Sequence, residues 1–177
     1  LKNFKFNKIK FKYIFFVAAL TPNYNKSIEK KSHFGSIEEG EFIKYHKVNC
    51  FSPIKIFEHI SKNNYLCNDA KIFFFSSIAS SISLRGKLKH NKRKGNLLYR
   101  LSKSSLNCAV KNLAYDFGNT KKIFISIHPG WVKTNSGGSK ADLEINEATK
   151  KIVKLVESIN KEHSGKFLDL YGKEIEW

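Results

Sequence analysis

Four short apolar runs mark a chain that is otherwise rich in polar residues. They are Tyr13 to Leu20, Lys71 to Ser77, Ile123 to Ile127 and, more briefly, Lys166 to Leu170. Runs of this length that are rich in phenylalanine and isoleucine are typical of strands buried on both faces of a sheet. The pattern therefore predicts a strand in each run.

The segment between the first two runs has the spacing of a helix. Apolar residues recur at helical intervals from Phe42 to Ile60, and Ser36 is a candidate N-cap. Pro53 lies inside this stretch and predicts a kink or a break, because proline lacks the backbone N–H that the helix needs. Asn63 and Asn64 should end the helix.

Two further helices follow the later strands. One runs from Leu97 to the stop signal Gly118-Asn119, with an apolar stripe at Leu106, Val110, Leu113 and Phe117. The other runs from about Glu144 to Asn160. Strands that alternate with helices predict an α/β fold with a parallel sheet of about four strands. Ligands bind such sheets at the carboxyl ends of the strands, where Ser77 and Pro129-Gly130 fall.

Charge changes this picture little. The 177 residues carry a formal net charge of +17, which points to an anionic partner. The excess is almost entirely lysine and is spread along the chain together with abundant asparagine, isoleucine and phenylalanine. We therefore expect a solvated lysine surface rather than a nucleic-acid face. The basic connection at residues 85–95 is either a solvated insertion or a contact for an anionic substrate.

Cysteine usage and apolar run lengths bear on the compartment. Cys50, Cys67 and Cys108 are widely spaced and fit neither a disulfide framework nor a metal site, so we expect free thiols in the cytoplasm. No apolar run is long enough to span a membrane. The basic residues 1–12 ahead of an apolar run resemble a signal peptide, but the strand–helix pattern that follows favours a strand.

Tyr99 and Lys103 stand out as candidate chemistry. They are four residues apart, so on a helix both side chains lie on one face, one turn from each other. A lysine ammonium beside a phenol favours the phenolate, and a phenol so placed can give or take a proton near neutral pH. The same spacing also occurs in ordinary surface pairs, so the residues before and after it decide.

Those residues come in a familiar order. Ser76-Ser77 ends a strand, Tyr99 to Asn107 reads YRLSKSSLN, and His128 to Thr134 reads HPGWVKT. In this order they resemble the short-chain dehydrogenase/reductase family, and most of all its carbonyl-reductase-like branch, which includes the C-factor and Sniffer proteins. The resemblance covers about Tyr13 to Trp177.

The resemblance assigns roles to individual positions. Tyr99 would be the general acid, Lys103 would support it and hold the nicotinamide ribose, and Ser77 would bind the substrate oxygen. Asn49 would support a water-mediated proton path, while His128 would serve packing rather than base catalysis. The cofactor would be NADP or NAD, with NADPH favoured, and its binding residues would be Ala18, Ala19, Tyr99, Lys103, Pro129, Gly130, Trp131, Val132 and Thr134.

One part of the family pattern is missing from the sequence. There is no Gly-rich turn to receive the cofactor pyrophosphate. Tyr13 to Ala19 matches the fourth strand of the family, so we expect a partial Rossmann-like three-layer fold that lacks the first dinucleotide-binding half. The edge of that strand would then be unpaired and aromatic. The chain contains no methionine and begins at Leu1, which also points to an N-terminally truncated protein.

Three functions remain open at this point. The first is an NAD(P)-dependent oxidoreductase acting on a small carbonyl or alcohol, with residues 13–177 as its catalytic part and residues 1–12 as a basic N-terminal segment. The second is a non-catalytic remnant that serves as an interaction module. In either case a homodimer could form through the helices around 38–61 and 97–117. The third, a polyanion binder, rests on charge alone.

Overall fold

The computed structural model describes residues 9–21, 33–87 and 95–177, which contain one parallel sheet. Its strands are β1 (Phe11–Phe16), β2 (Leu66–Phe75), β3 (Ile123–Ile127) and β4 (Lys166–Leu168), in the order β1-β2-β3-β4. Every neighbouring pair is parallel. The predicted α/β fold with about four parallel strands is confirmed.

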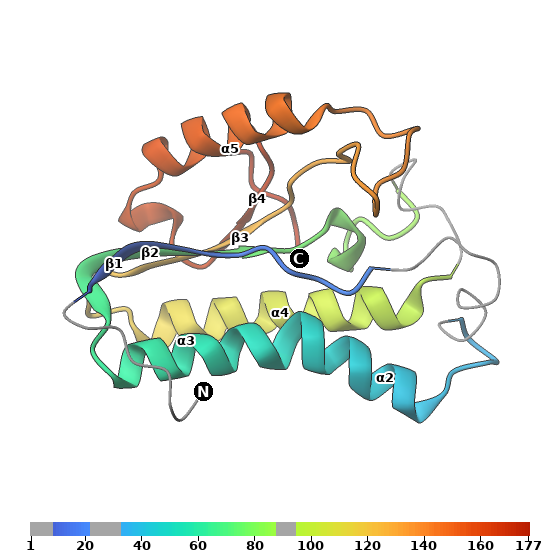
Figure 1. Cartoon of the computed structure of the whole chain (residues 1–177), viewed down its shortest axis with the longest axis horizontal. Helices are drawn as coiled ribbons and strands as arrows, with labels where there is room; N and C mark the ends of the chain where they lie inside the picture. Colours follow the sequence, from blue (N-terminus) through green and yellow to red (C-terminus); the bar gives the residue numbers. More distant parts are fainter. Residues whose placement is uncertain (1–8, 22–32, 88–94) are drawn as a thin grey trace.

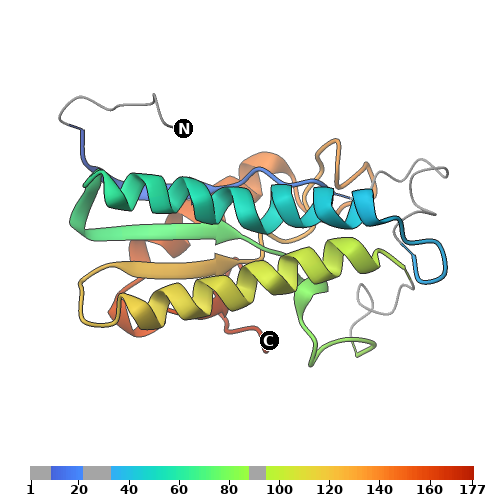
Figure 2. The same ribbon diagram turned by 90° about the horizontal axis from the view of Figure 1, so that it is seen from below.

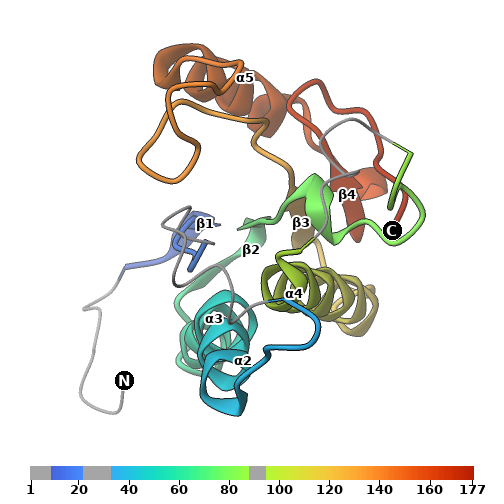
Figure 3. The same cartoon turned by 90° about the vertical axis from the view of Figure 1, so that its right-hand side faces the viewer.

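Helices cover both faces of this sheet. They are α2 (Glu39–His46), the π-helical turn η2 (Lys47–Phe51), α3 (Ser52–Lys62), α4 (Leu97–Asp116) and α5 (Ile145–Ser158), with short 3-10 turns η3 (Ile78–Ser80) and η5 (Lys161–His163). Helices α2, α3 and α4 lie on one side of the sheet and α5 lies on the other (Figures 1 and 3). Seen from below, the α2–α3 rod and α4 run side by side in the same direction (Figure 2). The three-layer α/β/α arrangement follows.

Alternating side chains of the buried strands build two cores. On the helix-rich side, Ile72, Phe74 and Phe124 pack with residues of α3 and α4, which include Phe57, Ile60, Leu106 and Val110. On the other side, Phe73, Ile125 and Ile127 pack against α5 and the segment after it, through Leu155 and Ile159. The period of two in a strand sends neighbouring residues to opposite faces, so one apolar run supplies both cores. Leu113 and Phe117, predicted with Leu106 and Val110 as a stripe, are half-buried against the first core.

Pro53 does not break the helix, because helical backbone continues from Glu39 to Lys62. Proline cannot donate to the carbonyl four residues earlier, which belongs to Asn49. The chain responds with the π turn η2, in which the Ser52 N–H bonds the Lys47 carbonyl oxygen, five residues back. The Ser52 hydroxyl donates to the same oxygen at 2.7 Å. The proline then sits in the first turn of α3, where its missing N–H costs nothing.

The predicted N-cap of this helix is wrong. Glu38, not Ser36, occupies the capping position of α2, and its side chain makes no cap hydrogen bond. The Ser36 hydroxyl instead donates to the His33 carbonyl oxygen at 3.3 Å, inside the turn that precedes the helix. The acidic residues Glu39 and Glu41 of the first turn favour the positive end of the helix dipole instead.

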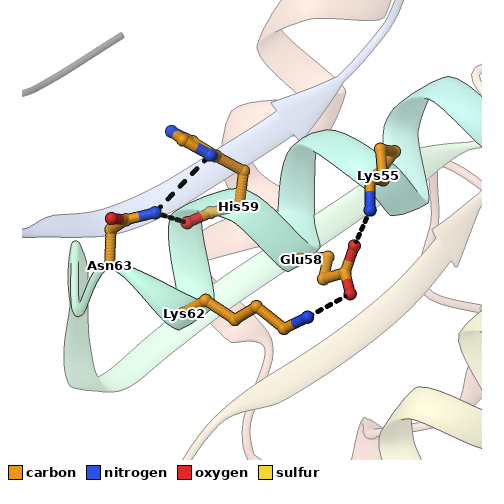
Figure 4. Close-up of polar contacts among 5 residues, drawn as sticks. All are labelled: Lys55, Glu58, His59, Lys62 and Asn63. Atoms are coloured by element: carbon orange, nitrogen blue, oxygen red, sulfur yellow. Dashed lines mark hydrogen bonds and ion pairs between the residues drawn. The ribbon is translucent and has the colours of Figure 1, made fainter. Parts of the chain in front are cut away.

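The C-terminal end of α3 agrees with the prediction (Figure 4). Asn63 is the C-cap, and its amide donates to the His59 carbonyl oxygen at 2.8 Å. On the exposed surface one turn earlier, the Glu58 carboxylate lies 2.5 Å from the Lys55 ammonium and 2.6 Å from that of Lys62. These spacings of three and four residues bring the charges together on one face of the helix.

The outer face of β1 remains apolar and exposed. Within the described part of the chain β1 pairs only with β2, as the family resemblance predicted. Tyr13, Phe15 and Val17 are 44%, 43% and 57% exposed, and we call them the β1 face. The Phe15 ring stacks on that of Phe73 with centroids 5.1 Å apart.

Two sequence predictions lie mostly outside the described residues. The basic segment 1–12 is described only at 9–12, and the basic connection 85–95 only at 85–87 and 95. None of the helices in the described ranges has the length and apolar character needed to cross a membrane.

Candidate active site

A cavity of about 790 Å³ opens at the carboxyl ends of β1, β2 and β3. Its walls come from residues that directly follow each of these strands, from the first two turns of α4 and from the start of α5. The predicted site residues that line it are Ala19, Ser77, Tyr99, Lys103, Pro129, Gly130, Trp131, Val132 and Thr134. Ligand sites of parallel sheets lie at this edge. The cavity is therefore at the position where the sequence predicts a ligand site.

Lys103 is the most deeply buried charged group of this wall. Its side chain is on α4, is 2% exposed, and its Nζ donates to the Phe75 carbonyl oxygen at 2.6 Å. Burial lowers the pKa of Lys103 to about 8, and the nearby Cys50 opposes this change. An ammonium has three hydrogens, so two remain for a ligand in the cavity.

Tyr99 stands one helical turn before Lys103 and is half-buried. Both side chains line the cavity, as their spacing predicted. The Tyr99 carbonyl oxygen accepts a hydrogen bond from the Ser102 hydroxyl at 2.8 Å. The first turns of α4 thus present a phenol and an ammonium to the same space.

Ser77 faces this pair from the end of β2. It is the N-cap of η3, and its Oγ accepts a hydrogen bond from the Ala79 N–H at 3.2 Å. That bond uses a lone pair of the oxygen and leaves the hydroxyl hydrogen available to donate. Ser77 can therefore donate to an oxygen of a molecule in the cavity.

The segment after β3 forms the opposite wall, and two of its glycines are required by space. Gly130 has φ +75°, and a Cβ on it would lie 2.6 Å from Cδ1 of Leu143. A Cβ on Gly137 would lie 1.9 Å from the Val132 carbonyl oxygen. The Trp131 indole N–H donates to the Gly137 carbonyl oxygen at 2.8 Å and folds the loop over the cavity.

Thr134 has a local role in this loop. Its hydroxyl accepts from the Gly137 N–H at 3.0 Å and lies 3.4 Å from the Val132 carbonyl oxygen, to which it donates. The Lys133 N–H donates to the Leu143 carbonyl oxygen at 2.8 Å, which connects the start of the loop to the segment just before α5. The loop is thus ordered by its own hydrogen bonds.

Asn49 does not line the cavity. Its amide is 1% exposed and lies between the chain after β1 and helix α4. The Asn49 Nδ2 donates to the Leu20 carbonyl oxygen and to the Ser102 hydroxyl, each at 2.9 Å. Its Oδ1 accepts from the Leu20 N–H at 2.7 Å. Asn49 therefore fastens the end of β1 to the helix that carries Tyr99.

Sequence reasoning missed several parts of this site. Ala18 precedes Ala19 but does not line the cavity, whereas Arg100, Leu143 and residues of α5 do. Ser102, whose hydroxyl accepts from Asn49, was also missed. Its position between Tyr99 and Lys103 in the sequence was the one available signal that it belongs to the site. The residues of α5 line the cavity because this helix packs on a face of the sheet, and no local sequence pattern shows where a helix packs.

Comparisons with known proteins agree with this geometry. The profile of a family described as enoyl-(acyl carrier protein) reductase matches residues 10–166. The chain is 27% identical over 143 residues to the C-signal protein of Myxococcus xanthus, and the match covers 81% of this chain and 82% of that protein.

Solved structures give the same picture. A short-chain dehydrogenase/reductase of Burkholderia multivorans with bound NADP superposes with a TM-score of 0.79 and 26% identity, over 96% of this chain and 68% of that one. The carbonyl reductase Sniffer of Drosophila melanogaster gives a TM-score of 0.77 and 28% identity, over 94% of this chain and 66% of that one. The chain thus spans about two thirds of the length of these structures.

Proposed function

Because the chain belongs to the short-chain dehydrogenase/reductase family, we propose that it is an NAD(P)-dependent oxidoreductase. Its substrate would be a small carbonyl compound, or the corresponding alcohol in the reverse direction. The observation that carries this proposal is the approach of Ser77, Tyr99 and Lys103 to one cavity from two separate elements.

The side chains would divide the chemistry as follows. The hydroxyls of Ser77 and Tyr99 donate to the substrate carbonyl oxygen and polarise it. A bound nicotinamide cofactor would supply the hydride to the carbonyl carbon. Tyr99 gives its phenolic proton to the oxygen, which completes the alcohol. The Lys103 ammonium stabilises the phenolate that this proton leaves behind.

The residues present fit the nicotinamide end of such a cofactor. The buried Lys103 ammonium keeps two N–H groups for a ribose, and the segment from Pro129 to Thr134 supplies a wall for the nicotinamide ring. Ala19, which lines the cavity, would border the same end, and Ala18 directly precedes it in the chain. Residues for the adenosine phosphates are not among those described here. The NADP bound to the Burkholderia multivorans protein supports NADPH as the cofactor of this chain.

Asn49 would support proton return to Tyr99. Its Oδ1 accepts one hydrogen bond from Leu20, which leaves a second lone pair for a water molecule.

Residues 13–177 would form the catalytic part of the Rossmann domain. We place the protein in the cytoplasm, since its three cysteines are free thiols.

A homodimer is a second element of the proposal. The outer surface of α2, η2 and α4 exposes large apolar side chains, among them Ile43 (54%), Phe51 (58%) and Tyr115 (87%). Helices packed side by side from two copies would cover this surface. The same surface would serve a non-catalytic interaction module, which is the alternative function. Sedimentation of the chain and of Phe51→Asp tests the dimer, because the introduced carboxylate should release monomers.

NADPH binding and turnover test the oxidoreductase proposal. Titration of NADPH fluorescence with the purified chain should show binding, and a panel of small carbonyl compounds should show NADPH oxidation. Tyr99→Phe should abolish turnover and retain binding, because only the proton donor is removed. Tyr115→Phe is the matched control, on the same helix but 87% exposed and away from the cavity. A folded chain that binds no NADPH at millimolar concentration would overturn the proposal and leave the interaction module.

A further inference from the structure

One face of α4 is hydrogen-bonded to the segment that carries Ser77. The Arg100 guanidinium donates to the Ala79 carbonyl oxygen at 3.0 Å, and the Ser104 hydroxyl donates to the Ser80 carbonyl oxygen at 2.8 Å. Asn107 donates to the Ser80 hydroxyl at 2.7 Å. Helical spacing puts these side chains of α4 on one face. The face beside the one that presents Tyr99 and Lys103 to the cavity therefore holds the segment that follows β2.

Ser80 is the centre of this network. Its side chain is 3% exposed, and its Oγ donates to the Ser77 carbonyl oxygen at 2.6 Å. A hydroxyl has one hydrogen and two lone pairs. Ser80 spends the hydrogen on Ser77, so it accepts from Asn107 at 2.7 Å and from the Ser76 hydroxyl at 3.3 Å. Every hydrogen-bonding capacity of this hydroxyl is used.

The result is a direct connection between the two halves of the candidate site. From α4, the chain of contacts runs through Asn107 and Ser80 to the backbone of Ser77. The Ser80 N–H also bonds the Ser77 carbonyl oxygen at 2.9 Å, which closes η3. A buried hydroxyl whose hydrogen and lone pairs are all used holds one arrangement, because any shift leaves a polar group without a partner.

We propose that Ser80 is a positioning residue, which fixes the Ser77 hydroxyl relative to Tyr99 by anchoring the end of β2 to α4. The inference rests on the proposed function of Ser77 and Tyr99. Ser80 does not touch the substrate in this scheme. It acts through Ser77, and a misplacement of about 1 Å at a catalytic group costs up to about a hundredfold in rate.

Hydrogen exchange tests the positioning without any need for activity. Ser80→Ala should speed the exchange of the Ala79 and residue-80 amides at least about tenfold, because both bond Ser77 and opening of η3 exposes them. Ser81→Ala is the matched control. That neighbouring serine is equally buried, but its hydroxyl donates to the Glu176 carbonyl oxygen, so it should leave these two amides unchanged. Unchanged exchange in Ser80→Ala overturns the proposal.

Turnover gives the second measurement. Ser80→Ala should lower kcat about ten- to a hundredfold with an unchanged NADPH dissociation constant. In a Ser77→Ala background the same substitution should lower kcat no further, because its effect passes through Ser77. Additive losses would overturn the proposal, since general destabilisation acts independently of Ser77. If Ser80→Ala fails to fold, Ser104→Ala loosens the same segment and takes its place in both measurements. If the wild-type chain lacks turnover, the proposed function fails, and the exchange measurement alone decides the role of Ser80.

Discussion

The Lys103 ammonium and the Phe75 carbonyl oxygen, 2.6 Å apart, join helix α4 to the last residue of β2. The bond holds a charge in a place where water scarcely reaches, since Lys103 is 2% exposed. One carbonyl does not replace the hydration of an ammonium, and the pKa of Lys103 therefore falls to about 8. The cost of this burial should be measurable as a dependence of stability on pH.

Lys103→Met should remove that dependence. Below about pH 8 the ammonium is charged in both folded and unfolded chains, so the folded state bears the full cost of burial. Between about pH 8 and 10.5 the folded protein releases the proton first, and stability rises. The free energy of unfolding of the wild type minus that of Lys103→Met should thus increase by about 3 kcal/mol across this interval. Urea denaturation at a series of pH values measures it, and a constant difference would contradict the burial argument.

Asn49→Ala should destabilise the fold by about 2 kcal/mol, because it leaves the Leu20 backbone and the Ser102 hydroxyl without the amide they bond. Asn112→Ala is the control, since that exposed amide bonds only within α4, to Cys108. We expect it to change stability by less than about 0.5 kcal/mol. Urea midpoints compare the two variants. Equal effects would show that the hydrogen bonds of Asn49 between the end of β1 and α4 add nothing to the free energy of unfolding.

Gly137→Ala should weaken NADPH binding roughly tenfold, about 1.4 kcal/mol. The new methyl would meet the Val132 carbonyl oxygen at 1.9 Å, so the loop that walls the cavity must shift. Gly40→Ala is the contrasting change, because nothing lies within 4 Å of a Cβ there. Since Gly40 is inside helix α2, alanine should stabilise it by about 0.5–1 kcal/mol. Fluorescence titration and thermal unfolding report the two effects, and unaltered NADPH binding by Gly137→Ala would count against the loop as a cofactor wall.

Glu58 should titrate far below an ordinary glutamate. The Lys55 and Lys62 ammonium groups hold the pKa of its carboxyl at about 2, against 4.5 for a free side chain. The stabilisation is present above pH 4.5 and is lost as the pH falls toward 2. An NMR titration of the carboxyl carbon measures the midpoint. Replacement of both lysines by alanine should return it to the ordinary value, and because the group is exposed, salt should raise it as well.

Tyr13→Glu should reduce aggregation of the isolated chain. The β1 face is apolar and lies at the edge of the sheet, where exposed strands pair with other chains. The Lys71 ammonium lies 6.0 Å from the Tyr13 ring, so a carboxylate there gains an opposite charge. Light scattering over time, at matched concentration, compares the variant with the wild type. Faster scattering by the variant would locate the association surface elsewhere.

The predicted fold followed from patterns that act locally. β3 was predicted at its observed bounds, because four of its five residues are apolar and all five are buried. β2 begins earlier than predicted, at Leu66, because Asn68 and Asp69 are exposed strand residues that resemble a loop in sequence. The π turn was not foreseen, since the sequence shows only that Pro53 lacks a donor and not how the backbone compensates.

The candidate site divides in the same way. Tyr99 and Lys103 could be paired from sequence because a helix fixes their spacing. Ser80 and Asn107 are 27 positions apart, and their bond depends on how β2 and α4 pack. The contact of Asn49 with Leu20 spans 29 positions. Such contacts follow from tertiary packing, so a single sequence gave no signal for them.

The π turn η2 also determines which changes in chain length the α2–α3 rod can tolerate. Its hydrogen bond spans five residues instead of four, so the turn holds one residue more than regular helix. Deletion of a single codon within residues 47–51 would restore regular winding. Regular winding would bring the Pro53 ring against the carbonyl group four residues before it, which costs about 3 kcal/mol or more. At this place a shortened reading frame is more harmful than most amino-acid exchanges.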